Sequence, residues 1–203
     1  VWHSFERCLD YIAFALKNGI AYSKPIGAIM LPDMQQIQPQ WMIGVPRLWE
    51  SLAKGVFRKM NKTGGTTLKL FNFFIAVGAK YSIYRDLVRG RTIRYTPRLR
   101  SFDFVKGLIP FLLLWPLYKI GDVLIYSKIK ATLGGKIRGA ISGGGALQPD
   151  IDKFYQAIGF NLLEGYGITE AAPVLSVRSY KCPRPGCVGL ILECVEMKHI
   201  TRV

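Results

Sequence analysis

The sequence predicts an α/β fold in which strands and helices alternate around a largely parallel sheet. Half of the 203 residues are apolar, which is enough to bury a sizeable core. Apolar residues recur with the helical period in some segments and alternate with polar residues, as in strands, in others. Residues 137–163 combine the two patterns in the order strand, loop, helix, strand, which is the order of a βαβ unit.

The first sixty residues are expected to contribute alternating helices and strands. Apolar residues fall at helical spacing from Trp2 to Leu16, and Asn18-Gly19 supplies a helix stop. Pro46 ends an apolar run that has the length of a strand. We therefore expect, in chain order, a helix at 2–16, a strand at 20–23, a polar helical turn at 32–36, a strand at 41–45 and a helix at 47–59.

Residues 62–69, KTGGTTLK, are rich in Gly and Thr but lack the pattern of a Walker-type phosphate loop. That loop ends in Gly-Lys-Ser/Thr, and here no Gly directly precedes Lys69 and no hydroxyl follows it. Gly-Gly followed by Thr-Thr is ordinary loop material, so we expect a solvated linker.

The chain is strongly basic, with a formal net charge of +15. This charge favours an anionic partner, and composition alone does not choose among nucleic acid, a membrane surface and a phosphorylated small molecule. Residues 85–138 hold twelve Lys and Arg against three Asp, so they carry nine of the fifteen net charges.

An uncharged run, Leu108–Tyr118, lies inside this basic segment. As a helix it would extend about 16 Å, roughly half of a ~30 Å hydrocarbon core. Pro110 and Pro116 are expected to break that helix, so we do not expect a membrane span. Two interpretations stay open: a buried core segment beside a solvated basic face, or an apolar wedge carrying Trp115 that lies in a membrane interface.

The segment from Lys136 onward is the most informative. Ile137–Ser142 alternates like a strand, and the loop Gly143–Ala146 follows it. Pro149 opens a helix with acidic residues in its first turn, and Gly159 stands at the C-terminal cap position. Phe160–Leu163 is expected to be the next strand, parallel to the first.

In such units ligands bind beyond the carboxyl ends of the strands, so loop 143–146 and residues 164–170 are expected to face one crevice. Tyr166 offers an aromatic face, Thr169 a hydroxyl for a phosphate oxygen, and Glu170 a hard carboxylate suited to Mg²⁺. Together these groups suit a nucleotide. The alternative is purely structural: a tight turn, a helix cap and a glycine hinge.

The segments Ile141–Leu147, ISGGGAL, and Glu164–Glu170, EGYGITE, resemble motifs of the adenylate-forming superfamily, and within it of the long-chain fatty acyl-CoA synthetases. Supporting similarity lies at residues 2–7, 44–50 and 186–189. The resemblance is weakest between about Lys62 and Lys119. It implies a central fragment of the large N-terminal AMP-binding domain, residues 1–203, with a basic and apolar insertion at about residues 62–130.

The resemblance implies a two-step ligase. ATP and Mg²⁺ join a fatty acid carboxylate to AMP with loss of pyrophosphate, and the thiol of CoA then displaces AMP. Thr169 and Glu170 are the expected catalytic residues, with Thr169 at phosphate and Glu170 holding Mg²⁺. His3 is expected near the acyl carboxylate; a helix-end histidine without a substrate contact is its alternative. The residues expected to bind the cofactor are Gly144, Gly145, Ala146, Glu164, Gly165, Tyr166, Gly167 and Thr169.

Other parts of the family pattern are expected outside this sequence. A Ser/Thr/Gly-rich phosphate loop should precede His3, and a ribose-binding Asp and a C-terminal domain with a catalytic Lys should follow Val203. We therefore expect the isolated chain to be inactive. The parent enzyme is expected in the cytoplasm, peripheral at the inner membrane face, with no nucleic acid partner.

Two alternative functions stay open. One is a non-enzymatic basic module that binds membrane or nucleic acid through residues 85–138, and the other is an adenylating ligase for another carboxylic acid.

Cysteine spacing indicates reduced structural thiols, because no CxxC pair occurs. By ligand type alone, a metal site from Cys182, Cys187, Cys194 and His199 is conceivable.

Overall fold

The computed structural model describes residues 3–93, 100–196 and 198. The helices are α1 (Ser4–Ala15), α2 (Gly27–Ile37), α3 (Pro46–Thr63), α4 (Gly65–Val88), α5 (Arg100–Gly121), α6 (Ser127–Thr132) and α7 (Pro149–Ala157), with a π-helical segment at Asp122–Tyr126 and a 3₁₀ turn at Thr169–Ala171. The strands are β1 (Trp41–Gly44), β2 (Gly139–Ser142), β3 (Leu162–Gly167), β4 (Val174–Val177) and β5 (Leu190–Ile191).

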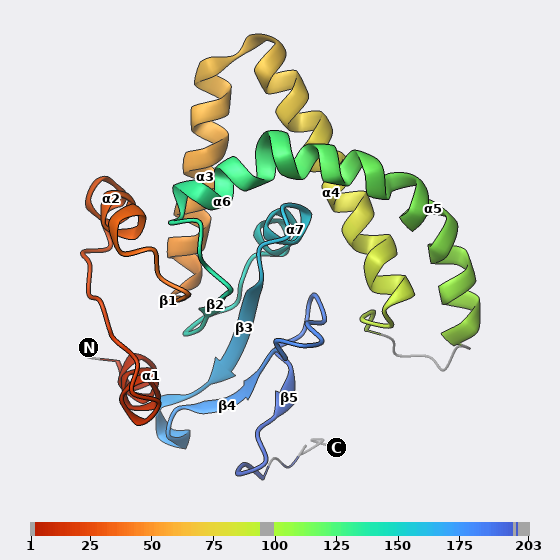
Figure 1. Cartoon of the computed structure of the whole chain (residues 1–203). Coiled ribbons are helices and arrows are strands. Elements are labelled where there is room, and N and C mark those ends of the chain that lie inside the picture. Colours follow the sequence, from red (N-terminus) through yellow and green to blue (C-terminus); the bar gives the residue numbers. More distant parts are fainter. Residues whose placement is uncertain (1–2, 94–99, 197, 199–203) are drawn as a thin grey trace, which may run out of the picture.

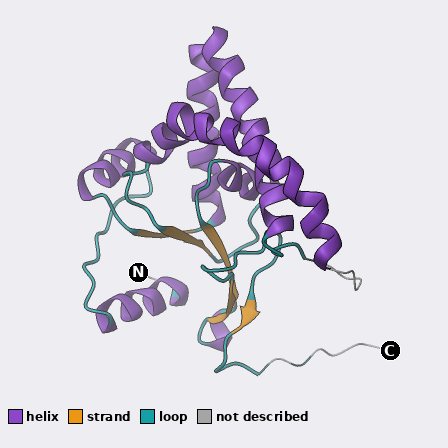
Figure 2. Ribbon diagram, turned by 45° about the vertical axis from the view of Figure 1, so that its right-hand side comes forward, coloured by secondary structure: helices purple, strands orange, loops and turns teal. Residues whose placement is uncertain are grey.

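The strands form one sheet in the order β1-β2-β3-β4-β5. The pairs β1–β2 and β2–β3 are parallel, and β3–β4 and β4–β5 are antiparallel. The α/β prediction is confirmed, and the sheet is mixed: its parallel part contains the predicted βαβ unit, β2-α7-β3. Figures 1 and 2 show α3 to α7 gathered on one side of the strands, with α1 apart from them.

Aromatic residues form much of the core between the sheet and these helices. Trp49 of α3 is fully buried, and its ring meets those of Tyr155 and Phe160 at centroid distances of 5.8 and 6.0 Å. The Tyr155 hydroxyl donates a hydrogen bond to the Trp49 carbonyl at 2.9 Å. This packing fixes α7 against α3, and α7 in turn positions the loop that precedes it.

Several predicted elements are confirmed with shifted ends. The described part of the first helix is Ser4–Ala15, the second predicted helix extends to Thr63, and the polar turn near 32–36 belongs to the longer helix α2. The strand expected at Phe160–Leu163 runs from Leu162 to Gly167 instead. Gly159 has a φ of +68°, which fits its predicted place just beyond the end of α7.

The predicted strand at 20–23 is wrong, because these residues form no strand. Their polar groups bond to side chains instead of to a neighbouring strand: the Tyr22 hydroxyl donates to Asp10 at 3.2 Å and the Ser23 hydroxyl to Asp33 at 2.6 Å. A short apolar run becomes a strand only when a partner strand is adjacent.

The predicted linker at 62–69 is also wrong. Lys62 and Thr63 end α3, and α4 begins at Gly65, so a single residue joins the two helices. That residue, Gly64, has a φ of +63°, a left-handed conformation that reverses the chain without a loop. The exposed Gly-Thr composition therefore marks a sharp helix–helix turn.

The expectation that Pro110 and Pro116 break the apolar run is wrong as well. Both lie inside α5, and helical structure continues through the π-helical segment into α6. Figure 1 shows this stretch as one curved rod that crosses α4. Packing along α4 holds the rod together: the Tyr81 ring of α4 stacks on Phe111 at 5.2 Å and on Tyr118 at 4.1 Å.

Candidate nucleotide site

The candidate site lies where two neighbouring parallel strands end. Ser142, the last residue of β2, pairs with Glu164 of β3, so the loop Gly143–Ala146 and the end of β3 leave the sheet at the same edge. A cavity of about 290 Å³ opens there. Its lining residues are His3, Phe5, Gly144, Gly165, Tyr166, Gly167, Ile168, Thr169, Glu170, Pro173 and Val174.

Two glycines allow the chain segments around this cavity to approach closely. A Cβ on Gly143 would lie 2.5 Å from the Phe5 ring, so its absence lets α1 lie against the loop. A Cβ on Gly167 would clash with the Pro173 carbonyl, so its absence lets the chain turn back from β3 into β4. The second glycine of the Gly-Tyr-Gly turn is therefore required by a close backbone contact.

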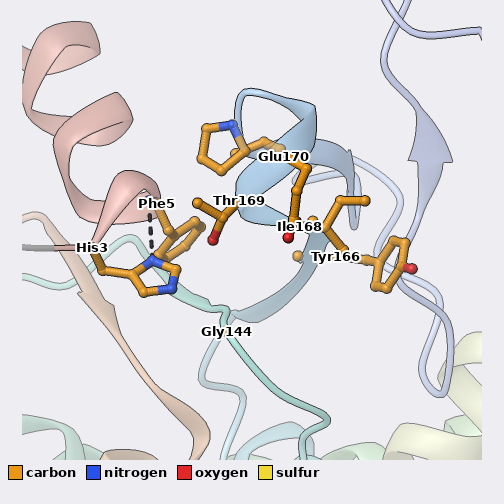
Figure 3. Close-up of a pocket in the computed structure, with 11 residues that line it drawn as sticks. His3, Phe5, Gly144, Tyr166, Ile168, Thr169 and Glu170 are labelled. Atoms are coloured by element: carbon orange, nitrogen blue, oxygen red, sulfur yellow. Dashed lines mark hydrogen bonds between the residues drawn. The ribbon is translucent and has the colours of Figure 1, made fainter.

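The polar side chains of the site come from that turn and from the start of α1. Thr169 and Glu170 lie in the 3₁₀ turn and are exposed. In Figure 3, Thr169 lies between His3 and Glu170, whereas the ring of Tyr166 points away from His3. Tyr166 is 46% exposed, so its aromatic side chain is accessible to a planar ligand.

The two ring nitrogens of His3 can serve different roles, one in capping α1 and one in binding a ligand. It is the N-cap of α1, and its Nδ1 accepts a hydrogen bond from the Phe5 backbone N–H at 3.2 Å. Because Nδ1 accepts, the neutral ring carries its proton on Nε2, which can donate to an oxygen of a ligand in the cavity. The helix-end position of His3 and its place in the cavity lining therefore coexist.

Glu170 and Thr169 are the described groups suited to a magnesium ion. Mg²⁺ in nucleotide sites takes one or two carboxylates together with phosphate oxygens, so a carboxylate beside a hydroxyl fits it. Among the described residues, no group of three or more His, Cys, Asp and Glu could hold a metal by itself. The four cysteines are free, and His199, named with three of them above, lies outside the described residues.

Three predicted binding residues do not line the cavity. Gly145 and Ala146 are exposed in the outer part of the loop. Glu164 is 9% exposed, and its carboxylate bonds to protein groups: the Leu147 N–H donates to Oε1 at 3.0 Å and Arg178 Nη2 donates to Oε2 at 3.1 Å. Arg178 was missed by sequence reasoning, since an isolated Arg after an apolar strand gives no signal of burial.

A second cavity, of about 370 Å³, lies at the other end of β3, beside Asn161 and Leu162. Its lining includes Arg85, Arg91 and Lys181. Burial lowers the pKa of Arg91, and repulsion from Arg89 lowers it further. Because this cavity faces away from the carboxyl ends of the parallel strands, we place the candidate site at the first cavity.

Comparisons with known proteins identify the family of the chain. A family model described as AMP-binding enzyme matches residues 1–200. The chain is 28% identical to a protein of Arabidopsis thaliana named probable acyl-activating enzyme 16, chloroplastic, over 98% of this chain and 28% of that protein.

Other relatives carry related names. The chain is 31% identical to the long-chain-fatty-acid–[acyl-carrier-protein] ligase AEE15 of Arabidopsis thaliana, again over 98% of the chain and 28% of the relative. It is 26% identical to the long-chain-fatty-acid–CoA ligase FadD15 of Mycobacterium tuberculosis, over 92% of the chain and 27% of the relative. The chain thus spans less than a third of the length of these relatives, and no solved structure matches it significantly. Because the family model covers nearly the whole sequence, the chain belongs to the AMP-binding enzyme family.

Proposed function

We propose that the whole protein is an ATP-dependent, AMP-forming ligase that activates the carboxylate of a long-chain fatty acid and passes the acyl group to a thiol. The observation that carries this proposal is that Gly144, Tyr166, Gly167, Thr169 and Glu170 line one cavity. Membership of an enzyme family favours the ligase over a non-enzymatic basic module.

The reaction needs positioning and charge neutralisation more than a protein nucleophile. A carboxylate oxygen attacks the α-phosphorus of ATP, the bond to the β-phosphate breaks, and pyrophosphate leaves with the bonding electrons. The acceptor thiolate then attacks the acyl carbon, and AMP leaves. Both steps bring anions together, so oriented donors and a cation lower the barrier.

The residues of this chain divide that work. The Tyr166 face would pack on the adenine, with the backbone of Gly144 giving the ring close access. Thr169 would donate its hydroxyl to a phosphate oxygen, and Glu170 would hold Mg²⁺, which neutralises phosphate charge when bound. His3 would donate from Nε2 to the acyl carboxylate.

The test is carboxylate-dependent ATP–pyrophosphate exchange by the whole protein. We expect exchange with long-chain fatty acids and a loss of about a hundredfold or more in Glu170→Ala. Asp150→Ala is the matched control, because that carboxylate lies at the exposed start of α7 and its side chain is 93% exposed. Equal exchange in Glu170→Ala and the wild type would contradict the assignment.

The acyl acceptor can be identified by a second assay on the same purified whole protein. We propose CoA, as in the CoA ligase names, and the relative named as an acyl-carrier-protein ligase supplies the competing acceptor. Acyl transfer to CoA, measured beside transfer to holo acyl carrier protein, distinguishes the two. Transfer to the carrier protein alone would overturn CoA and leave the adenylation step intact.

We also propose that α5 lies on an anionic membrane, with the protein in the cytoplasm and peripheral at the inner membrane face. The helix from Arg100 to Thr132 has the length and composition to cross a membrane, and only 6% of its most apolar 18-residue stretch is buried. Val105, Ile109, Leu112 and Leu113 lie on its outer side and are 59–69% exposed. An apolar face of this size beside a basic segment fits an anionic lipid surface.

The contacts of α5 favour lying in the interface over crossing the bilayer. Its inner side packs along α4, with Gly107 against Leu87 and Val88, and the buried carboxylates of Asp86 and Asp103 lie in these two helices. A crossing orientation would draw these charges into hydrocarbon, at a cost of several kcal/mol. A position parallel to the surface immerses the apolar side alone.

Liposome co-sedimentation tests this surface. We expect the whole protein to bind vesicles containing phosphatidylglycerol, to bind less at high salt, and to lose binding in Leu112→Asp with Leu113→Asp. Leu190→Asp, at a site that is 80% exposed on β5, is the matched control. If another part of the whole protein covers α5, the double variant will lower thermal stability and leave vesicle binding unchanged, which refutes the proposal.

A further inference from the structure

Arg178 lies at the centre of a buried ionic network beneath the candidate site. It follows β4 directly and is 2% exposed. Its Nη1 donates to both carboxylate oxygens of Asp152 at 3.0 and 3.1 Å, and its Nη2 donates to Glu164 at 3.1 Å. Its Nε donates to the Cys187 carbonyl at 3.0 Å. One side chain thus joins α7, β3 and the segment that follows β4.

The carboxylate of Glu164 links this network to the glycine-rich loop. Oε2 faces Arg178, and Oε1 accepts the backbone N–H of Leu147, the buried residue that directly follows the loop. Glu164 also directly precedes Gly165-Tyr166-Gly167. A single carboxylate therefore fixes the end of the loop and the start of the turn, which are the two sides of the cavity.

The backbone braces the same position. The N–H of Arg178 donates to the Glu164 carbonyl at 2.9 Å, and Gly165 pairs with Val177 in the antiparallel ladder. Glu164 is consequently held through its main chain from β4 and through its side chain from Arg178. A rotation of the carboxylate away from Leu147 would break a charge-assisted bond to Arg178.

Stability alone does not account for such a network. Burying two carboxylates and one guanidinium costs desolvation, and apolar residues of similar volume often stabilise a core as well or better. What the ionic arrangement supplies is directional bonding at fixed distances, which an apolar cluster lacks.

We propose that Glu164, Arg178 and Asp152 are positioning residues that hold the glycine-rich loop at a fixed distance from the Gly-Tyr-Gly turn. None of the three lines the cavity, so they act through the backbone of Leu147 and of Gly165. Under this proposal, Glu164 acts on the site through the Leu147 backbone instead of binding the cofactor as the sequence predicts. The proposal rests on the proposed function only in so far as the two held segments bind the nucleotide.

Hydrogen exchange of the Leu147 amide tests the proposal without any activity measurement. In the whole protein, Glu164→Ala should speed exchange at Leu147 about tenfold or more, because a charge-assisted bond is lost. Glu164→Gln keeps an acceptor oxygen for Leu147 and should restore most of the protection. Asp150→Asn, on the exposed end of α7, should leave exchange unchanged.

Kinetics then separate positioning from general stability. We expect Glu164→Ala to raise the KM for ATP about tenfold in pyrophosphate exchange while the KM for the fatty acid stays near the wild-type value. Exchange at Leu147 that stays at the wild-type rate in a folded Glu164→Ala protein overturns the proposal. Should that variant fail to fold, Arg178→Lys, which loses the two-pronged contact, carries the same measurement with the same criterion.

The outcomes distinguish this proposal from the proposed function. If hydrogen exchange at Leu147 is faster in Glu164→Ala but the wild-type protein shows no fatty acid-dependent pyrophosphate exchange, the positioning network is supported and the ligase is refuted. Wild-type Leu147 protection in an active Glu164→Ala enzyme would refute the network and leave the ligase standing.

Discussion

At the scale of single residues, the shape of the candidate cavity depends on glycines that let chain segments approach closely. Gly143 is required by the Phe5 ring and Gly167 by the Pro173 carbonyl. For Gly165, which lies in β3, the nearest atom to an added Cβ would be 3.7 Å away. The two glycines of the Gly-Tyr-Gly turn therefore differ sharply in how much space a side chain would have.

This contrast predicts unequal effects of alanine at two glycines. Gly167→Ala should destabilise the protein by about 1–3 kcal/mol and abolish pyrophosphate exchange, because the new Cβ forces the turn open. Gly165→Ala should cost less than about 1 kcal/mol. Urea unfolding monitored by circular dichroism gives both values. Equal losses in the two variants would contradict the steric argument.

The cap made by His3 allows its two roles to be separated. His3→Ala should cost about 1 kcal/mol through loss of the N-cap, whereas His3→Asn retains a capping oxygen for the Phe5 N–H. If the ring donates to the acyl carboxylate, both variants should raise the KM for the fatty acid equally. A normal KM in His3→Asn would leave His3 as a helix cap alone.

At the scale of elements, the α4–α5 pair shows how packing overrides local preference. Tyr81 of α4 is 7% exposed and stacks on Phe111 and Tyr118 of α5. Each ring also buries apolar area, so these contacts hold α5 against α4 while the helix continues past its two prolines. This α4–α5 interface depends on residues of both helices, so the α5 sequence does not encode it by itself.

The α4–α5 interface predicts that alanine substitution lowers stability strongly on the buried side of α4 and only weakly on its exposed side. Tyr81→Ala should lower the free energy of unfolding by about 3 kcal/mol, since it leaves a cavity between stacked rings. Ile83→Ala, on the same helix at a site that is 59% exposed, should change it by about 0.5 kcal/mol or less. Denaturant midpoints compare the two; a similar loss in both would refute the packing role.

At the scale of the whole molecule, buried tyrosines make the fold sensitive to alkali. Burial raises the pKa of Tyr118 to about 12, against the opposing attraction of Arg85, and burial also raises the pKa of Tyr126 and of Tyr155. The unfolded chain releases these protons near pH 10 while the folded chain retains them. Stability is therefore full below pH 10 and falls as the pH rises towards 12.

Tyr118→Phe tests this dependence. In the wild type, titration of the Tyr118 hydroxyl should lower the free energy of unfolding by about 2–3 kcal/mol between pH 10 and pH 12. The variant lacks this hydroxyl and should not show that loss. Urea midpoints measured at pH 9, 10, 11 and 12 should therefore converge for the two proteins at low pH and separate at high pH. Parallel curves across that range would show that Tyr118 titrates normally.

Local patterns were sufficient for some features of this protein. The alternation in Ile137–Ser142, the Pro149 start and the Gly159 stop predicted a βαβ unit, because each signal acts within a few residues of its effect. The motif Glu164–Glu170 and the loop 143–146 predicted two segments at one edge of the sheet, and the structure brings both to the same cavity. Parallel pairing required this, since both segments follow adjacent strands.

Other features depended on contacts between distant parts of the chain. The strand predicted at 20–23 lacked a neighbour, the linker at 62–69 was replaced by a one-residue turn, and α5 passed through its prolines because α4 supports it. Glu164 does not line the cavity, and Arg178, fourteen residues away, binds its carboxylate. The sequence by itself determined the α/β class and the motif-bearing loops, whereas tertiary structure alone decided which side chains face the cavity, because burial and ion pairing are set by neighbours that no local pattern specifies.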